Sequence, residues 1–273
     1  MLILLILIYL VFQAGIAVII LRYNSIIRLK HITVLCLLLA IYAWTHWVDT
    51  AWLYRVLPNK YGIVLYNPIP LLVILIFSLL ISEPVKNRAR VVLYGFLAIA
   101  VNTLFFSSAF YNPIHCEDSW DGICCLQTTD STCAAAAAAT LLRLRGITTN
   151  EEEMKELCLS GFHGTTLGGM YHGIRVKADA VGMRVAVDNI SCDEFLAKNE
   201  AAIVYVMLDK EMDARDKRYS RDWGWIVGTT HAVVFLGTAD GSHVFIANPG
   251  TGLEKWHTEA LKRLWQHKAV YIQ

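Results

Sequence analysis

The chain carries almost no net charge and lacks a nucleotide-phosphate loop. Its 24 Lys and Arg nearly balance 23 Asp and Glu, which gives a formal net charge of +1 at pH 7. Nucleic-acid-binding domains present a basic surface with interleaved aromatic side chains. No such segment is present, so we expect no nucleic-acid partner. No G-x-x-x-x-G-K-[ST] motif occurs in the 273 residues, and we expect no ATPase activity of the chain's own.

Sequence motifs typical of metal-binding and phosphate-binding sites are also missing. Cys124 and Cys125 are adjacent rather than spaced as C-x-x-C, and the glycines of GTTLGG at 164–169 lack the Lys-Ser/Thr of a phosphate loop. We interpret that segment as a turn and a helix start. Six histidines show no zinc-ligand spacing with cysteines or acids: His115, His163, His172, His243, His257 and His267. We therefore expect neither a metal site nor a bound cofactor.

What the sequence does have, in its first 110 residues, is long apolar runs. They occupy residues 2–21, 32–53, 61–81 and 91–110. Each has roughly the 20 residues that a helix needs to cross a hydrocarbon core of about 30 Å. The first run has no basic residue before it and no small-x-small cleavage site, so we interpret it as a span rather than a signal peptide. The sequence predicts an all-α, four-helix transmembrane domain over residues 1–112; four buried core helices of a soluble protein are the alternative.

The charges between these runs predict an orientation. The loops after the first and third runs are basic, with Arg22, Arg28, Lys30, Lys86, Arg88 and Arg90. The segment after the fourth run is acidic. The positive-inside rule then places both basic loops in the cytoplasm. We expect a multi-pass protein of the cell membrane, with the lipid bilayer as a partner and an extracytoplasmic C-terminal domain in which some of the six cysteines are oxidised.

The second half, residues 113–273, is long enough for a domain with its own core. Helical patterns come first, at 133–145, 151–159 and 166–181, and strand patterns follow at 184–187, 202–208, 231–237, 243–248 and 269–272. Short helices are predicted at 194–199 and 258–265. Helices followed by antiparallel strands indicate an α+β fold. The turn TADGSH at 238–243 predicts a hairpin between two of these strands.

Four residues in this half have the chemistry of a cysteine hydrolase. Gln127 precedes Cys133 by six residues, Cys133 begins an Ala-rich helical pattern, His231 begins one strand of the hairpin and Asn248 ends the other. In that chemistry a thiolate attacks a carbonyl, an imidazole moves the proton, an Asx side chain orients the imidazole and a Gln amide helps to hold the oxyanion. The antiparallel hairpin predicts that His231 and Asn248 meet. The helix start predicts a lowered thiol pKa for Cys133.

Each residue also has a structural interpretation. A lone free cysteine is most often a small buried apolar side chain, and a His at a strand start is often structural. Residues 209–230 are charged and then aromatic. They are either a mobile lid, with Trp223 and Trp225 contacting substrate, or a solvated loop whose Trp side chains rest on the core or on a membrane surface.

The segments QTTDSTCAAAAAATLLRLRGI, GTTLGGMYHGIRVKADAVGMRV, HAVVFLG and ANPGTG resemble, in order, the double-glycine leader peptidases. That family comprises papain-like cysteine peptidases that process bacteriocin and peptide-pheromone precursors. The resemblance covers about residues 123–273. It implies a papain-like peptidase domain in which Gln127 is the oxyanion donor, Cys133 the nucleophile, His231 the base and Asn248 the orienting residue.

The chain departs from the family in three respects. The family usually has Cys-Gly where this chain has Cys133-Ala134, and Asp-Pro where it has Asn248-Pro249. An Asn carbonyl can still accept the His N–H, and we expect Asn248→Asp to keep or raise activity. The commonest family architecture places the peptidase domain ahead of an exporter's spans and ATPase, whereas here it follows the four predicted spans.

Together these features predict a membrane-anchored cysteine peptidase that cleaves a peptide or precursor protein through a Cys-His-Asn triad. A separate exporter or another membrane protein is a further candidate partner. Two alternatives stay open. One is amidase or transpeptidase chemistry on the same fold. The other is an inactive pseudo-peptidase that binds a peptide and signals through the spans.

Overall fold

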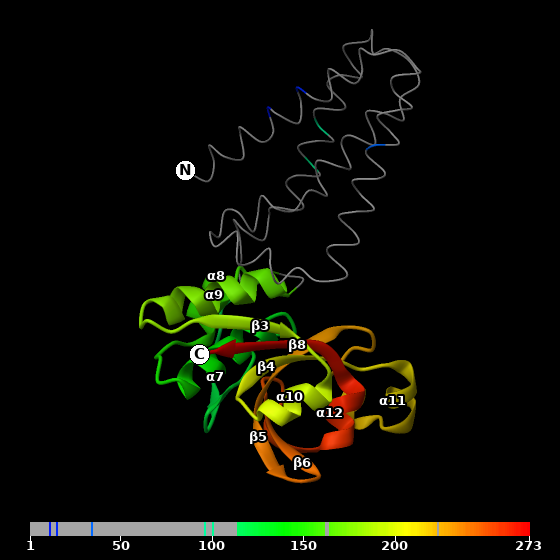
Figure 1. The fold of residues 1–273 in the computed structure, drawn as a ribbon. Coiled ribbons are helices and arrows are strands. Elements are labelled where there is room, and N and C mark those ends of the chain that lie inside the picture. The colour runs from blue at the N-terminus through cyan, green and yellow to red at the C-terminus, as the bar shows by residue number, and fades with distance from the viewer. Residues whose placement is uncertain are drawn as a thin grey trace. The chain divides into compact units, whose positions relative to one another are not determined.

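The computed structural model describes residues 114–161, 164–222 and 224–273, together with the isolated positions 11, 15, 34, 96 and 100. Apart from those isolated positions, the four predicted spans, and with them the predicted transmembrane domain, lie outside the described residues. Among the residues that are described, none belongs to a helix that is both long and apolar enough to cross a bilayer. Asn112–Gln273 form one compact unit, coloured from green to red in Figure 1.

Three helices begin this unit: α7 (Cys133–Leu144), α8 (Glu151–Leu157) and α9 (Leu167–Asp179). Alanine has the highest helix propensity, and the six alanines 134–139 are all buried, so α7 is a central helix. It ends before Gly146, whose φ of +74° suits glycine. Asn150 accepts a hydrogen bond from the Glu153 amide at the start of α8, and Thr166 accepts one from the Gly169 amide at the start of α9.

A six-stranded antiparallel sheet follows, in the order β3-β8-β4-β5-β6-β7. Its strands are β3 (Val185–Asn189), β4 (Ala202–Met207), β5 (Thr230–Asp240), β6 (His243–Asn248), β7 (Gly252–His257) and β8 (Trp265–Ile272). The central strand β4 is apolar throughout, because both faces of the sheet are covered there. The predicted α+β fold is thus confirmed for the described residues.

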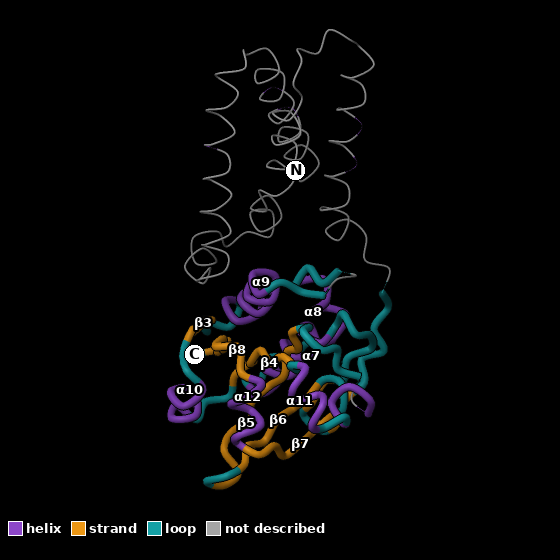
Figure 2. The backbone as a smooth tube through the Cα atoms, turned by 90° about the vertical axis from the view of Figure 1, so that its right-hand side faces the viewer, coloured by secondary structure: helices purple, strands orange, loops and turns teal. Residues whose placement is uncertain are grey.

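The two faces of β4 pack against different helices. Val204 and Val206 point into the core that includes Phe195 of α10 (Cys192–Lys198) and Leu264 of α12 (Thr258–Leu264). The Tyr205 hydroxyl donates to Met170 Sδ on α9, 3.6 Å away. Figures 1 and 2 show α7, α8 and α9 on one side of the sheet and α10 and α12 on the other.

Several elements differ from the sequence-based expectation. β7 was not predicted, nor was the small pair β1 (Trp120–Asp121) and β2 (Cys124–Cys125). Residues 209–222 are not a structureless loop, because they form α11 (Lys210–Arg215) and the single π-helical turn η1 (Arg218–Asp222). Asp209 starts α11 by accepting from the Met212 amide.

Cysteine oxidation is not seen in the described residues. Their six cysteines are all free, and five of them are buried: Cys116, Cys124, Cys125, Cys158 and Cys192. The expected disulfides are therefore absent from this part of the chain.

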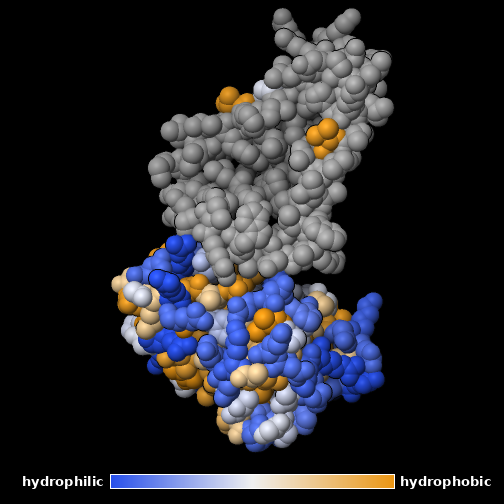
Figure 3. All heavy atoms as spheres, in the orientation of Figure 1, coloured by the Kyte–Doolittle hydropathy of each residue, from blue (hydrophilic) through white to orange (hydrophobic). Residues whose placement is uncertain are grey.

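On the surface of the same unit, hydrophilic residues occupy much of the face shown in Figure 3.

Candidate active site

Cys133 is the first residue of α7, directly after a compact turn. The Thr132 amide donates to the Thr129 carbonyl at 3.1 Å, and the Thr132 hydroxyl donates to the same carbonyl at 3.0 Å. This turn fixes the direction in which the chain enters the helix. The helix start was predicted correctly, and the cysteine is half-buried there rather than enclosed in the core.

The protonation state of Cys133 differs from the expectation. Burial raises the pKa of its thiol above the ordinary 9.0, although the backbone N–H groups of Ala232 and Ala134 donate to the sulfur and act in the opposite direction. Removal from water destabilises the thiolate more than the backbone N–H groups and the helix start stabilise it. The predicted lowering of this pKa is therefore wrong for the structure, and the group is a neutral thiol at pH 7.

His231 and Asn248 meet as the hairpin predicts. Strands β5 and β6 pair antiparallel, and His231 Nε2 lies 2.9 Å from Asn248 Oδ1. Asn248 is fully buried. Its Oδ1 also accepts from the Gly250 amide at 3.1 Å, while its Nδ2 donates to Glu254 Oε1 at 3.4 Å. One partner requires an oxygen and the other requires an NH₂ group, so the amide has one consistent orientation.

This orientation decides which imidazole nitrogen carries the proton. An oxygen at Asn248 can only accept, so a neutral His231 must be protonated at Nε2. The lone pair is then on Nδ1. A general base needs a free lone pair on the nitrogen that faces its proton donor. With Asn248 in this orientation, the free lone pair of a neutral His231 is on Nδ1.

Trp225 covers this ring and belongs to the core. Its centroid is 4.8 Å from that of His231 and 5.7 Å from that of Trp256, and only 6% of Trp225 is exposed. The interpretation in which Trp225 rests on the core is thus confirmed, whereas Trp223 lies outside the described residues. Burial lowers the pKa of His231 below the ordinary 6.5, and the bond to Asn248 acts in the opposite direction.

Gln127 is held beside Asn248 through the backbone. Its amide donates to the Pro249 carbonyl at 2.8 Å. The next residue, Thr128, donates through its amide and its hydroxyl to the buried carboxylate of Glu151, at 2.7 and 2.6 Å. The Gln127 side-chain Oε1 is buried without a hydrogen-bond partner. The segment is therefore anchored by two sets of hydrogen bonds, while Oε1 of the Gln127 side chain has no hydrogen-bond partner.

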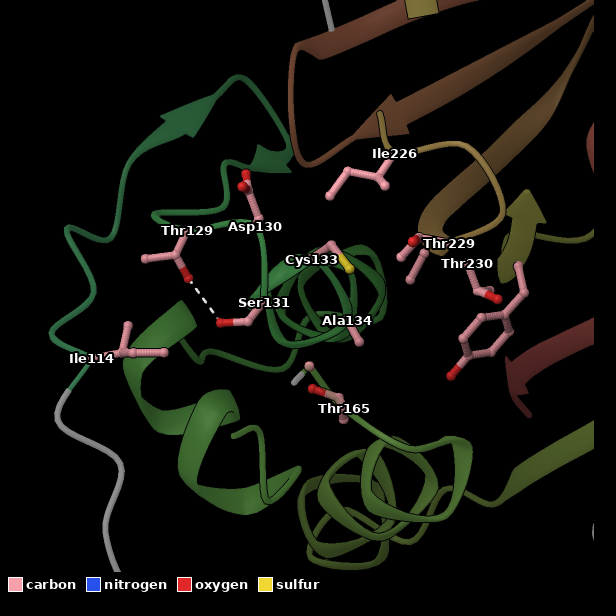
Figure 4. A pocket seen from close by; sticks show the side chains of 13 residues that line it. Ile114, Thr129, Asp130, Ser131, Cys133, Ala134, Thr165, Ile226, Thr229 and Thr230 are labelled. Carbon is pink, nitrogen blue, oxygen red and sulfur yellow. Dashed lines mark hydrogen bonds between the residues drawn. The ribbon is translucent and has the colours of Figure 1, made fainter. Parts of the chain in front are cut away.

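A cleft of about 650 Å³ opens at Cys133. That volume is in the range of small-ligand and peptide side-chain sites. Figure 4 shows Cys133 between the turn that carries Thr129 and Ser131 and the segment that carries Ile226 and Thr229. Ile226 is 60% exposed at its rim. Asp130 is the cleft's charged lining residue among those described.

The structure brings some of the predicted residues together more closely than others. Asn248 binds His231 directly, and Ala232, the residue after His231, donates its amide to the Cys133 sulfur. Within the described contacts, no hydrogen bond joins Cys133 Sγ to the His231 ring, and none joins Gln127 to Cys133. Across residues 114–161, 164–222 and 224–273, no three His, Cys, Asp or Glu side chains are grouped to hold a metal ion.

Two contributors were missed by sequence reasoning. Glu254 and Glu151 are carboxylates bonded to Asn248 and to the Thr128 segment, respectively. Neither has a motif spacing to a site residue. The β7 sequence GLEKWH has no regular alternation of polar and apolar residues, so it gave no signal that would have placed Glu254 beside Asn248.

Solved structures provide the comparisons. The peptidase domain of Streptococcus ComA, described as a bi-functional ABC transporter involved in a quorum sensing pathway, is similar with a TM-score of 0.41 and 16% identity. The match covers 54% of this chain and 94% of that chain. A double glycine motif protease from an AMS/PCAT transporter, in complex with the leader peptide, gives 0.40 and 15%, covering 54% and 87%.

The peptidase domain of Streptococcus mutans ComA gives a TM-score of 0.38 and 16% identity, with 55% of this chain and 98% of that chain covered. No protein-family model matches the sequence, and no curated protein matches it.

Proposed function

We propose that this chain is a membrane-anchored cysteine peptidase that cleaves a peptide or a precursor protein. Cys133 is the nucleophile, His231 the general base and acid, Asn248 the residue that orients His231, and Gln127 an oxyanion donor. The observation that carries the proposal is the 2.9 Å bond between His231 and Asn248. Ala232, the residue after His231, is among the residues whose backbone N–H groups donate to the sulfur of Cys133.

The chemistry starts from a neutral pair, because burial raises the pKa of the thiol and lowers that of the imidazole. His231 Nδ1 takes the thiol proton as Cys133 Sγ attacks the scissile carbonyl. The developing oxyanion takes hydrogen bonds from the Cys133 amide at the start of α7 and from the Gln127 side chain. His231 returns the proton to the leaving amine, and water then hydrolyses the thioester, which regenerates the thiol.

The proposal includes the membrane. The four apolar runs of residues 1–110 anchor the chain in a bilayer, and the basic loops after the first and third runs place residues 113–273 outside the cytoplasm. The substrate then reaches the cleft from the extracytoplasmic side. A separate exporter or membrane protein that delivers it is a further partner of the proposed enzyme.

A pseudo-peptidase that binds a peptide without cleaving it is the second candidate. It is favoured by two observations: the raised pKa of Cys133 and the absence, in the described residues, of a hydrogen bond between its sulfur and His231. A thiol that never loses its proton would still leave a cleft of about 650 Å³ for a peptide.

An electrophilic peptide probe separates the two candidates. The full-length chain in detergent is treated with a peptide vinyl sulfone, and the modified cysteine is located by mass spectrometry. We expect modification of Cys133 that disappears in Cys133→Ala and falls at least about tenfold in His231→Ala, because proton transfer to a positioned base contributes 10²–10⁴-fold. Cys116→Ala, which removes a buried thiol, is the matched control and should label as the wild type does.

Two results would contradict the enzyme. Labelling that is equal in wild type and His231→Ala would mean that the imidazole does not activate the sulfur. Binding of the peptide without labelling or cleavage would favour the pseudo-peptidase. Product masses from cleaved peptides separate the remaining alternatives. Transpeptidation joins the acyl part to an amine without adding water, whereas an amidase adds water as a peptidase does and is recognised by the amide bond that it cuts.

A further inference from the structure

We propose that Glu254 is a positioning residue of this site, which fixes the side-chain amide of Asn248 and so holds His231 as its Nε2–H tautomer. The inference rests on the proposed function, in which Nδ1 must carry the free lone pair. It adds a fourth member to the Cys-His-Asn arrangement. This member comes from β7, a strand that contains none of the other three.

Backbone geometry brings Glu254 to Asn248. Strands β6 and β7 pair antiparallel, and Asn248 lies opposite Gly252 at the end of the ladder. The Thr251 amide donates to the Asn248 carbonyl at 3.1 Å, which closes the turn between the two strands. Glu254 pairs with Ile246, which is two residues before Asn248 on β6, so the side chains of Glu254 and Asn248 are on the same face of the sheet.

The carboxylate is held in place by its other bonds. Glu254 Oε1 accepts from the Thr251 hydroxyl as well as from Asn248 Nδ2, and Oε2 accepts from Trp256 Nε1. Trp256 is itself buried and packs against Trp225, which covers His231. Both oxygens therefore have fixed partners, and the carboxylate cannot turn away from Asn248 without losing them.

The direction of donation in the hydrogen bonds from His231 to Asn248 and from Asn248 to Glu254 decides the tautomer of His231. A carboxylate can only accept, so the Asn248 atom facing it must be the NH₂ group. The opposite atom, Oδ1, then faces His231 and the Gly250 amide. If the group at 254 could donate, the Gly250 amide would be the remaining hydrogen-bond partner that favours the present orientation of Asn248. A turned-over Asn248 would lose that bond but present its NH₂ to His231 and stabilise the Nδ1–H tautomer. That tautomer has no lone pair for the thiol proton.

This contact changes the expectation for Asn248→Asp. From the sequence, an Asp at 248 should keep or raise activity, as a carboxylate stabilises the imidazolium. In the structure the new carboxylate would face Glu254 across the present 3.4 Å hydrogen bond. Two carboxylates at that separation repel each other, and the bond between 248 and 254 is lost. We therefore expect Asn248→Asp alone to lower activity.

The test reverses the polarity of the bond. In Asn248→Asp/Glu254→Gln the NH₂ group is on residue 254 and the acceptor is on residue 248. The hydrogen bond between them returns in the opposite direction, and the other oxygen of residue 248 still accepts from His231. The set comprises wild type, Asn248→Asp, Glu254→Gln and the double variant, as full-length protein in detergent. Glu200→Gln, an exposed carboxylate-to-amide change, is the matched control.

The first measurement does not depend on turnover. In ¹⁵N-histidine-labelled protein, the shifts of Nδ1 and Nε2 report the tautomer of neutral His231, assigned by its loss in His231→Gln. We expect the Nε2–H tautomer in wild type, in Glu200→Gln and in the double variant, and a substantial Nδ1–H population in Glu254→Gln. The same tautomer population in Glu254→Gln as in wild type would overturn the inference.

The second measurement is kcat/KM with a cleaved peptide. We expect each single variant to lose about tenfold and the double variant to recover to within about threefold of wild type, as coupled residues show. Losses that simply multiply in the double variant would show no coupling and would also overturn the inference. Failure of the proposed function gives a different result. Probe labelling of Cys133 would then be the same in wild type and in His231→Ala, whatever the tautomer of His231 in the wild type.

Discussion

Burial acts in opposite directions on Cys133 and His231, and this sets the pH dependence of the site. It raises the pKa of the thiol above 9.0 and lowers the pKa of the imidazole below 6.5. Between these values both groups are neutral. A preformed thiolate–imidazolium pair would instead lose its imidazolium in the alkaline range, and the two cases give different profiles.

We therefore expect kcat/KM to rise with pH as His231 loses its proton, with a midpoint below 6.5, and then to stay level to at least 9.0. The acid limb follows because protonated His231 cannot accept the thiol proton. The profile is measured with an uncharged peptide substrate, so that the substrate does not titrate. A fall in kcat/KM between about pH 7 and pH 9 would identify an ion pair and contradict the neutral one.

The sequence predicted Gln127 as an oxyanion donor, and the structure shows the contacts of its segment. The segment is fixed by Pro249 and Glu151, and the side chain has no partner at Oε1. We expect Gln127→Ala to lower kcat by about 10²–10³-fold with little change in KM, since one oxyanion donor is lost from the transition state only.

Steady-state kinetics on a cleaved peptide test this, with Gln127→Glu as the matched control. That variant keeps the size but replaces the donor with an acceptor, so it should be at least as slow as Gln127→Ala. A normal kcat with a raised KM in Gln127→Ala would place the residue in substrate binding rather than in oxyanion stabilisation.

For helices and strands, prediction succeeded where the local sequence pattern determines the secondary structure and failed where pairing with a neighbouring element determines it. β6 was predicted at 243–248 and occurs there, because its apolar run is bounded by a hairpin turn and by Pro249. β7 is an edge strand with the sequence GLEKWH and exposed Leu253 and Lys255. Its strand conformation comes from pairing with β6, and the sequence of β7 alone does not specify that pairing. α11 and η1 are likewise held by short-range ion pairs such as Lys217 with Asp213.

The glycines of α9 allow a prediction about the packing of α9 against α8. GTTLGG was interpreted as a turn and helix start, and α9 does begin at Leu167. A Cβ at Gly173 would lie 2.5 Å from Cys158 Sγ and 2.8 Å from the Cys158 amide nitrogen, so glycine there permits α9 to approach the end of α8. We expect Gly173→Ala to destabilise the unit by about 1–3 kcal/mol through overpacking.

Thermal unfolding of the full-length chain in detergent measures the effect. Gly241→Ala is the matched control, because nothing lies within 4 Å of a Cβ at that hairpin turn. Its midpoint should remain close to that of wild type. A Gly173→Ala variant with an unchanged midpoint would mean that α8 and α9 can separate at no cost.

For the whole molecule, the sequence predicted which residues form the candidate site but not their environment. The order Gln127, Cys133, His231, Asn248 predicted the candidate residues, and the hairpin correctly predicted that the last two meet. The cleft at Cys133 is lined by residues far apart in the chain, including Ala232 and Tyr205. Trp225 over His231 and Glu254 behind Asn248 likewise come from separate elements. Sequence spacing carries no information on such contacts, so the raised pKa of the Cys133 thiol and the contact of Glu254 with Asn248 were missed.

Membrane topology is a property of the whole chain and can be tested with single introduced cysteines. The basic loops predict that residues 22–30 face the cytoplasm and residues 113–273 face outward. In Gly241→Cys the new thiol is on an exposed hairpin turn, while the non-catalytic cysteines of the same unit are buried. We expect a membrane-impermeant maleimide to label Gly241→Cys in intact spheroplasts, with Cys133→Ala as the background to remove the half-buried thiol.

Ser25→Cys, in the same background and in the first predicted loop, is the counterpart and should label only after the membrane is opened with detergent. The background protein without either new cysteine measures residual labelling of the buried thiols. If Gly241→Cys is protected in spheroplasts and Ser25→Cys is labelled, the orientation is the reverse of the predicted one, and the substrate of the proposed peptidase must be met in the cytoplasm. If both label without detergent, the basic loop does not lie behind the membrane and the four-span prediction itself fails.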